Sequence, residues 1–212
     1  MSKIEKQVLS DLVYERIRNM IDEGVLAPGR KIDKLELSQL LGVSQTPIND
    51  ALARLAGERL VEQRSRQGCY VHAYTAAELM PIFELRAGLE GMAIRLCVER
   101  DDSAGLARIV HAFDGFEPPV PESRRSDYAR ADKLFHEGII EASGNPFLLE
   151  LMRSSGYLLK SNLGGLVRPP DETLPEHRAI IAALLRRDAL AAQELVIQHS
   201  LRSRDFIRTL AP

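Results

Sequence analysis

The hydrophobic positions of the first 74 residues form short blocks that are separated by turn residues. Apolar side chains at helical spacing predict a helix from about Val8 to Glu23, and Gly24 should end it. A second, short helix is predicted over Leu35–Leu41. Gly42 follows it directly, in a position where a left-handed glycine often closes a helix. The segment therefore begins as two helices joined through turn residues.

A third helix should begin only a few residues after Gly42 and run to about Glu58. Ser44 or Thr46 can cap its first turn, where Pro47 is tolerated because that turn needs no donated hydrogen bond. Such a short connection sets two helices at a steep angle, as in a helix-turn-helix. A glycine turn between two helices is also common elsewhere, so this feature by itself does not decide the function.

Two short strands should follow, Leu60–Arg64 and Cys69–Ala73, joined as a hairpin. The order of helix, short turn, helix and hairpin is typical of a winged helix-turn-helix. In that arrangement the second helix of the motif enters the major groove of DNA by its N-terminal end. Arg66 and Gly68 at the hairpin tip could approach the neighbouring minor groove.

From Thr75 onward the pattern changes to long helical periodicity. Thr75 and Glu78 have the spacing of a capping box, which predicts a helix that reaches about Arg100. Loops are expected at Glu117–Ser123 and Gly164–Pro170. Five more helices are predicted, near Ser103–Phe116, Ser126–Ser143, Pro146–Ser161, Glu172–Arg187 and Asp188–Leu210. The expected fold is mainly α: a winged helix-turn-helix over residues 1–74 and an all-α antiparallel bundle over residues 75–212.

Composition narrows the class of protein but does not identify it. The chain has 212 residues, 45% of them hydrophobic and 27% charged, which is ordinary for a globular protein. Its longest apolar run, Ala179–Leu185, is too short for a bilayer span, and no signal peptide is visible, so a cytoplasmic protein without membrane contact is expected. The net charge is only −2. A role in DNA binding must therefore rest on pattern rather than on charge.

Polar side chains interrupt the apolar stripes of three predicted helices. Asp132 and His136 stand four residues apart on one helical face, and His177 and His199 lie on the inward faces of two others. Burying such groups without partners is costly, and one shared metal ion would satisfy all four. The alternative is that each is a hydrogen-bonded core residue, with Asp132 and His136 as a local pair. Spacing alone leaves both interpretations open.

The N-terminal pattern resembles the GntR family of transcription regulators over residues 10 to 73. The resemblance rests on these stretches: Leu12-Val-Tyr-Glu15 with Ile17 and Ile21, Gly24-Val-Leu-Ala-Pro-Gly29, Leu37-Ser-Gln-Leu-Leu-Gly-Val-Ser-Gln-Thr-Pro-Ile48, Ala51-Leu-Ala-Arg-Leu55, Leu60-Val61 and Gly68-Cys-Tyr-Val71. The recognition helix of that family usually begins Ser-Arg-Thr-Pro-Val-Arg-Glu-Ala-Leu. Here the two arginine positions hold Gln45 and Asn49, and the acidic position holds Asp50. Since Gln and Asn pair with adenine where Arg prefers guanine, a known operator sequence cannot be transferred.

The resemblance implies a set of residues that contact DNA. Gln45 and Asn49 would read bases, while basic side chains and backbone amides at the helix start would contact phosphates. The candidate DNA-binding residues are Lys34, Ser44, Gln45, Thr46, Asn49, Arg54, Arg66 and Gly68.

The C-terminal region resembles the FCD ligand-binding domain of the FadR-type branch of this family, in its shorter, six-helix, VanR-like form. Four stretches carry it: Leu85-Arg-Ala-Gly-Leu-Glu-Gly-Met-Ala93, Asp132-Lys-Leu-Phe-His136, Gly144-Asn-Pro146 and Glu176-His-Arg-Ala-Ile180, followed by His199. The resemblance implies a divalent metal, zinc or nickel first, held by Asp132, His136, His177 and His199. It also implies a small organic acid as effector. Arg86 could clamp this acid, with Asn162 as a second contact, although Arg86 could instead pair with Glu90.

The sequence thus predicts a homodimeric DNA-binding regulator, a repressor, whose affinity for its operator responds to an organic acid in the C-terminal domain. Two rival functions remain. The same four side chains could hold a catalytic metal, which would make the chain a metal-dependent enzyme with an accessory DNA-binding module. Alternatively, the metal could only fasten a bundle whose role is dimerisation. No general base beside the metal motif supports the enzyme.

Overall fold

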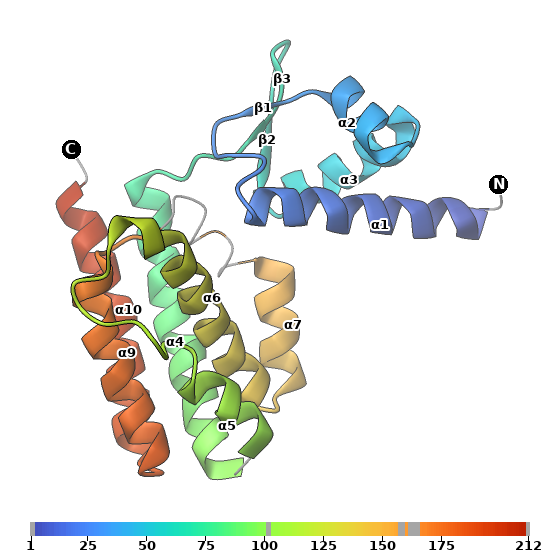
Figure 1. Ribbon diagram of the computed structural model, residues 1–212. Helices are drawn as coiled ribbons and strands as arrows, with labels where there is room; N and C mark the ends of the chain where they lie inside the picture. The colour runs from blue at the N-terminus through green and yellow to red at the C-terminus, as the bar shows by residue number, and fades with distance from the viewer. Residues whose placement is uncertain (1–2, 101–102, 157–159, 161–165, 211–212) are drawn as a thin grey trace. The chain divides into compact units, whose positions relative to one another are not determined.

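A computed structural model describes residues 3–100, 103–156, 160 and 166–210. The chain divides into two compact units, Met1–Tyr74 and Thr75–Pro212, and each is described here by itself (Figure 1). Among the described helices, none is long and apolar enough to cross a membrane.

The described part of the N-terminal unit is a winged helix-turn-helix, as predicted. Its elements are α1 (Lys3–Asp22), β1 (Lys31–Ile32), α2 (Lys34–Leu41), α3 (Gln45–Gly57), β2 (Val61–Arg64) and β3 (Gly68–Val71). The strands form an antiparallel sheet in the order β1-β3-β2, so the wing contains the two-residue strand β1, which the sequence analysis missed. Helices α1 and α3 pack together, and their core includes Ile17, Ile48, Leu52 and Leu55.

The turn between α2 and α3 forms for the predicted reasons, with one difference. Asp33 caps α2 by accepting hydrogen bonds from two backbone amides, and Gly42 ends the helix in the left-handed conformation at φ 65°. Ser44 occupies the N-cap position of α3, but its side chain makes no capping hydrogen bond. The prediction of Ser44 as the N-cap residue is therefore right in position and wrong in its hydrogen bond. The Ser44 hydroxyl does not hydrogen-bond to the first turn of α3.

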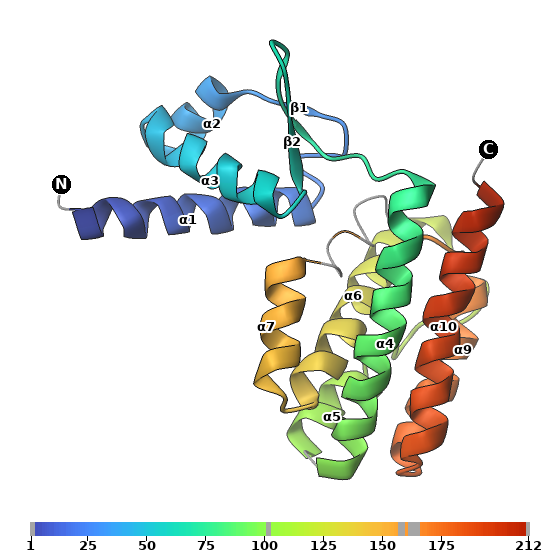
Figure 2. The same ribbon diagram turned by 180° about the vertical axis from the view of Figure 1, so that it is seen from behind.

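Six α-helices have described bounds in the C-terminal unit, and each overlaps one of the six predicted helices. They are α4 (Ala76–Arg100), α5 (Ser103–Val110), α6 (Arg125–Ala142), α7 (Pro146–Ser155), α9 (Pro170–Leu185) and α10 (Ala189–Leu210), with a short 3-10 helix at Glu122–Arg124. Figure 2 shows α4 and α10 side by side and running in opposite directions. The predicted capping box forms: the Glu78 carboxylate accepts from the Thr75 amide at 2.9 Å, and the Glu78 amide donates to the Thr75 hydroxyl.

Helix α1 begins at Lys3, earlier than the predicted Val8, and two helices of the C-terminal unit end more than a turn before their predicted ends. Helix α5 stops at Val110 rather than Phe116, because a series of turns follows that buries both Phe113 and Phe116 in the core. Helix α7 stops at Ser155 rather than Ser161, because Gly156 takes the left-handed conformation and its amide closes the helix on the Met152 carbonyl.

Close packing of α4 against α10 leads to a prediction at Gly91. A Cβ atom at this position would lie 2.7 Å from Cγ1 of Ile197, whereas one at Gly88, on the same helix, would meet nothing within 4 Å. Both Gly→Ala changes gain about 1 kcal/mol of helix propensity. Only Gly91→Ala incurs overpacking, which costs about 1–3 kcal/mol. We expect denaturant unfolding to rank Gly88→Ala as the more stable variant, and equal midpoints would show that Ile197 moves aside freely.

Candidate metal centre

Three helices bring the four predicted ligands together in the bundle. Asp132 and His136 project from successive turns of α6, His177 from α9 and His199 from α10. All four are buried, and one candidate ligand atom from each lies within 4.8 Å of the other three. Residues up to 67 positions apart in the sequence thus form one cluster, which could bind a metal ion.

Each imidazole is oriented by a hydrogen bond to its outer nitrogen, Nδ1. Glu90 on α4 lies 2.7 Å from Nδ1 of His136, and Tyr128 lies 3.0 Å from that of His177. Glu176 lies 2.7 Å from Nδ1 of His199. Such outer partners fix the ring and its tautomer, and metal-binding histidines almost always have them. Their presence on all three rings favours a built metal site over three unrelated core histidines.

The inner ring nitrogens test whether a metal fits. Nε2 of His136 and Nε2 of His177 are buried and have no hydrogen-bond partner among the described residues. The Asp132 carboxylate lies close to both, at 3.3 Å from Nε2 of His177 and 3.9 Å from Nε2 of His136. Leaving buried polar nitrogens unsatisfied costs free energy, and a cation between them and the carboxylate removes that cost. The donor set of three imidazoles and one carboxylate suits a divalent transition metal.

Burial disfavours the protonated form of two of the imidazoles, those of His177 and His199. It is the main cause that lowers the pKa of His177 well below its usual value, and the nearby imidazoles of His199 and His136 lower that pKa further. Burial also lowers the pKa of His199, although the hydrogen bond that this ring makes to the Glu176 carboxylate acts in the opposite direction. The ring of His177 also stacks on Phe113, with centroids 4.3 Å apart and planes 9° apart. The rings of His177 and His199 therefore favour the neutral form, which is the form that ligates metals.

Glu90 connects the metal cluster to Arg86, the predicted acid clamp. Its fully buried carboxylate accepts from Nε of Arg86 at 3.0 Å through one oxygen and contacts His136 through the other. Burial tends to raise the pKa of Glu90, but the positive charge of Arg86 and the interactions with His136 outweigh burial and lower this pKa to about 2. The ion pair that the sequence analysis kept as an alternative for Arg86 is thus present.

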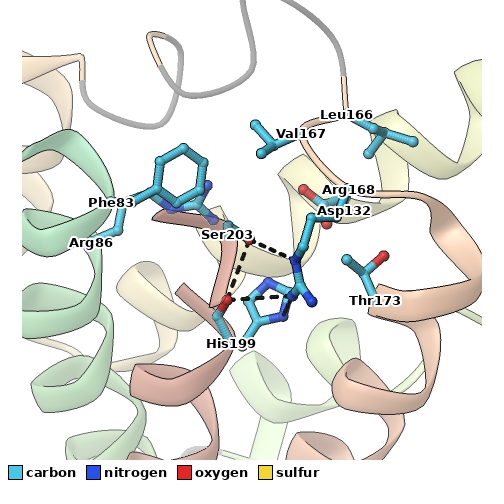
Figure 3. Close-up of a pocket in the computed structure, with 9 residues that line it drawn as sticks. All are labelled: Phe83, Arg86, Asp132, Leu166, Val167, Arg168, Thr173, His199 and Ser203. Atoms are coloured by element: carbon cyan, nitrogen blue, oxygen red, sulfur yellow. Dashed lines mark hydrogen bonds between the residues drawn. The ribbon is translucent and has the colours of Figure 1, made fainter. Parts of the chain in front are cut away.

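Arg86 also lines a small cavity beside the cluster, together with the metal-ligand candidates Asp132 and His199 (Figure 3). Arg86 can pair with Glu90 and also face this cavity, because its guanidinium has five N–H groups. The cavity volume is about 20 Å³, room for a water molecule and not for an organic acid. Asn162, the second predicted contact, lies outside the described residues.

The predicted DNA-binding residues lie around the start of α3 and at the hairpin tip. Lys34 donates to the Asn49 side-chain oxygen at 2.7 Å, so a residue predicted to contact phosphate is joined to one predicted to read bases. Gln45 and Thr46 are exposed in the first turn of α3. Arg66 sits in the hairpin turn with φ 61°. Gly68 follows it, with φ 109°.

Arg54, like Lys34, is a predicted phosphate contact that already has a partner within the protein. It pairs with Asp11 on α1, and its guanidinium lies 4.0 Å from the centre of the Tyr14 ring. Sequence reasoning assigned it to a phosphate because of its charge alone. In the structure it joins α3 to α1, so a contact with phosphate would have to share or replace the Asp11 pair.

Sequence reasoning missed four residues that build the metal cluster from outside. They are Glu90, as a partner of His136, together with Tyr128, Arg168 and Glu176. Glu176 adjoins His177 in the sequence yet supports His199, because neighbours on a helix point in different directions. Only Glu90 had a sequence signal for its role: it lies four residues after Arg86, which is the spacing of an ion pair on a helix.

The fold and this cluster define a class of protein: a DNA-binding transcription regulator with a helical C-terminal domain. Comparison with known families agrees. The FCD domain family matches residues 81–202, and the family described as bacterial regulatory proteins, gntR family, matches residues 9–71. The chain belongs to the GntR family of transcriptional regulators that carry a C-terminal FCD domain.

Individual relatives support this assignment over nearly the whole chain. The chain is 26% identical to the HTH-type transcriptional regulator YdhC of Bacillus subtilis (strain 168), covering 88% of this chain and 85% of that protein. It is also 26% identical to the HTH-type transcriptional repressor GlaR of Escherichia coli (strain K12), covering 89% and 90%. A GntR regulator from Rhodococcus sp. RHA1 shares the fold, with a TM-score of 0.79 at 20% identity over 96% of this chain and 99% of that one. The two relatives from Bacillus subtilis and Escherichia coli are named as transcriptional regulators and not as enzymes, which decides against the rival enzyme function.

Proposed function

We propose that this protein is a homodimeric transcriptional repressor whose operator affinity is controlled by a small organic acid bound beside a divalent metal. In this proposal residues 1–74 bind DNA, and residues 75–212 bind the effector and form the dimer. The observation that carries the proposal is the buried cluster of Asp132 and three histidines, with two unpartnered Nε2 atoms facing a carboxylate. The repressor role is supported by relatives that are named as repressors.

DNA binding is assigned to the start of α3 and to the wing. The N-terminal end of a recognition helix presents free backbone amides and short polar side chains, which suit contacts to phosphates and base edges. One such helix reads only a few base pairs, so a two-fold dimer on a pseudo-palindromic site doubles the contacts. Affinity should then fall steeply with rising salt, because each neutralised phosphate releases counterions.

Two variants should distinguish the residue that reads bases from the residue that contributes to DNA affinity in general. Asn49→Ala should relax base choice at one or two positions by about 1–3 kcal/mol, since a bidentate contact is lost. Arg66→Asn should weaken binding to all sequences about equally, because it removes a charge near phosphate. Asparagine is chosen since Arg66 has φ 61°, a conformation that alanine adopts poorly. Selection of bound fragments from random DNA measures both effects, and an unchanged motif for Asn49→Ala would refute its role.

In the proposed effector site, Asp132, His136, His177 and His199 hold the metal. A bound divalent ion that accepts five or six ligands would supply one or two further positions for a carboxylate. Zinc and nickel are the first candidates. Arg86 lines the small cavity beside these residues, where its guanidinium can contact the carboxylate end of an acid whose body lies outside that cavity. An effector shifts DNA affinity only if it binds one arrangement of the protein better than another, typically by about 1–3 kcal/mol.

The proposal is tested by isolating the DNA that the purified protein selects from genomic fragments and then measuring its affinity with and without organic acids. We expect at least one carboxylic acid to change the affinity for the selected site, and the response to disappear once a chelator has removed the metal. An affinity that stays constant across the acids would favour the rival in which the metal only fastens the bundle. Turnover of an acid would indicate an enzyme.

A further inference from the structure

Arg168, just before α9, is a buried cation that neither the sequence analysis nor the mechanism above uses. The residue is only 6% exposed. Its guanidinium makes a two-pronged ion pair with Glu176, with Nη1 3.0 Å from Oε1, and its Nε donates to the Ser203 hydroxyl at 3.2 Å. Burying an arginine is costly unless it is well paired, so its position is specified by the structure around it.

Arg168 lies between two cavities. On one side is the 20 Å³ cavity beside the metal cluster, where Figure 3 shows Arg168 reaching toward His199 and Ser203. On the other side is a cavity of about 530 Å³, which we call the outer cavity. Leu166 and Val167 also border both. The outer volume falls in the usual range for small-molecule sites, whereas the inner one holds no more than a water molecule or an ion.

The lining of the outer cavity is specific in chemistry. Among the described residues that line it, the charged ones are Arg125 and Arg168, and no carboxylate is present. The remaining wall is largely apolar: Ala129, Leu166, Val167, Pro169, Pro170 and Phe206. Arg125 and Ser126 also begin helix α6, where the helix dipole adds positive potential. Both arginines are paired with carboxylates that do not line the cavity, Arg125 with Glu122 and Arg168 with Glu176. An anion with a hydrocarbon body would fit this lining if its charged group competed for the N–H groups of the arginines.

We propose that Arg168 binds the carboxylate of the effector and that the outer cavity holds its apolar body. This inference rests on the proposed function and narrows its ligand to carboxylic acids with an apolar chain or ring, as against short or multiply charged acids. Arg168, which precedes α9, and Arg86, on α4, would then both contact the acid at the small cavity beside the metal cluster.

The ion pair between Arg168 and Glu176 also links effector binding to helix α10. Glu176, its partner, contacts Nδ1 of His199 at 2.7 Å and accepts from Arg202 at 2.8 Å. A carboxylate that binds Arg168 competes with Glu176 for the same N–H groups. That competition changes the contacts of two side chains on α10, one of them a metal-ligand candidate. Effector binding is thereby linked to the position of the helix that packs along α4.

The test is calorimetric titration of the zinc-loaded full-length protein without DNA, using hexanoate, acetate and hexanamide. Hexanoate and acetate share the charge and differ in the chain, whereas hexanoate and hexanamide share the chain and differ in charge. We expect hexanoate to bind at least about tenfold more tightly than either, because only it uses both parts of the site. Equal affinities for hexanoate and acetate, or undetectable hexanoate binding, would overturn the inference.

Variants locate the binding. Arg168→Gln should lower hexanoate affinity at least about tenfold with unchanged zinc content, since a charge-assisted pair is lost. Arg202→Gln is the matched control: it removes another arginine from Glu176 but does not line the outer cavity, and it should leave hexanoate binding within about threefold. Wild-type affinity in Arg168→Gln would contradict the assignment.

Should Arg168→Gln fold poorly, Ala129→Phe tests the outer cavity separately. The larger side chain fills space in the outer cavity, so it should weaken hexanoate binding while leaving acetate binding and zinc content unchanged; unaltered hexanoate binding would be evidence against the cavity. Because these titrations contain no DNA, a protein that binds hexanoate through Arg168 without any change in DNA affinity would refute the proposed regulation and leave the binding site intact. If acids regulate DNA binding equally in the wild type and in Arg168→Gln, the Arg168 binding site is refuted and the proposed regulation stands.

Discussion

Replacing His177 with alanine should abolish tight metal binding and destabilise the C-terminal unit. The imidazole is fully buried, stacks on Phe113 and supplies one of four ligand atoms. Truncating a buried ring leaves a cavity, and such changes cost about 2–5 kcal/mol in the free energy of unfolding. Loss of the ligand should come in addition, because a metal that binds only the folded state stabilises it. Denaturant unfolding with and without saturating zinc measures both effects.

The matched control for this change is His111→Ala. His111 is an exposed histidine whose ring contacts Asp114, and its side chain is 69% exposed. We expect a change in unfolding free energy within about 0.5 kcal/mol and unaltered metal binding. Unfolding in excess chelator then separates the effect of the cavity from the effect of the lost metal ligand. Under these conditions the loss in unfolding free energy caused by His177→Ala should become smaller but should persist. A His177→Ala protein that still binds one metal ion as tightly as wild type would contradict the ligand assignment.

Glu90→Gln should have the second-largest effect, although Glu90 is not a ligand. Its carboxylate holds Nδ1 of His136 at 2.7 Å and Arg86 at 3.0 Å, all at positions closed to solvent. Neutralising it weakens a buried ion pair, which costs about 3–5 kcal/mol when one partner is lost. Loss of an outer hydrogen-bond partner of a ligand typically lowers metal affinity about 10–100-fold. Metal titration and denaturant unfolding of the same variant should show both.

Helix α4 supplies its own control at the same spacing. Arg95 and Glu99 form an i,i+4 pair like Arg86 and Glu90, but their side chains are 42% and 46% exposed. Exposed pairs of this kind contribute about 0.3–0.5 kcal/mol, so Glu99→Gln should change stability little and metal affinity not at all. If Glu90→Gln behaves like Glu99→Gln, then Glu90 neither orients His136 nor balances Arg86.

Local sequence signals predicted the helices and the inward-facing positions of the four cluster residues, because those signals act over short distances. Gly42 ends α2 through its own left-handed conformation, and Thr75 with Glu78 caps α4 from three residues away. Asp132 and His136 are neighbours on one helical face by geometry alone. The polar interruptions at His177 and His199 were visible for the same reason: each breaks an apolar stripe of its own helix.

What the sequence did not reveal depends on contacts between distant segments. Glu90 meets His136 across 46 residues, and Tyr128 meets His177 across 49. No periodicity within one helix encodes which face of another helix lies opposite. The early end of α5 has a similar cause, since the turns after Val110 are stabilised by burying Phe113 and Phe116 in the bundle. Strand β1 has two residues, too few for an alternating pattern, and forms because β3 offers a free edge.

The most direct test of the central claim, a metal held by Asp132, His136, His177 and His199, is a titration of zinc and nickel into metal-stripped protein. The account predicts one ion bound per chain in the wild type, with affinity reduced at least about 100-fold in His136→Ala and unchanged in His111→Ala. A wild-type protein that binds neither ion, or a His136→Ala variant that binds as tightly as wild type, would contradict it.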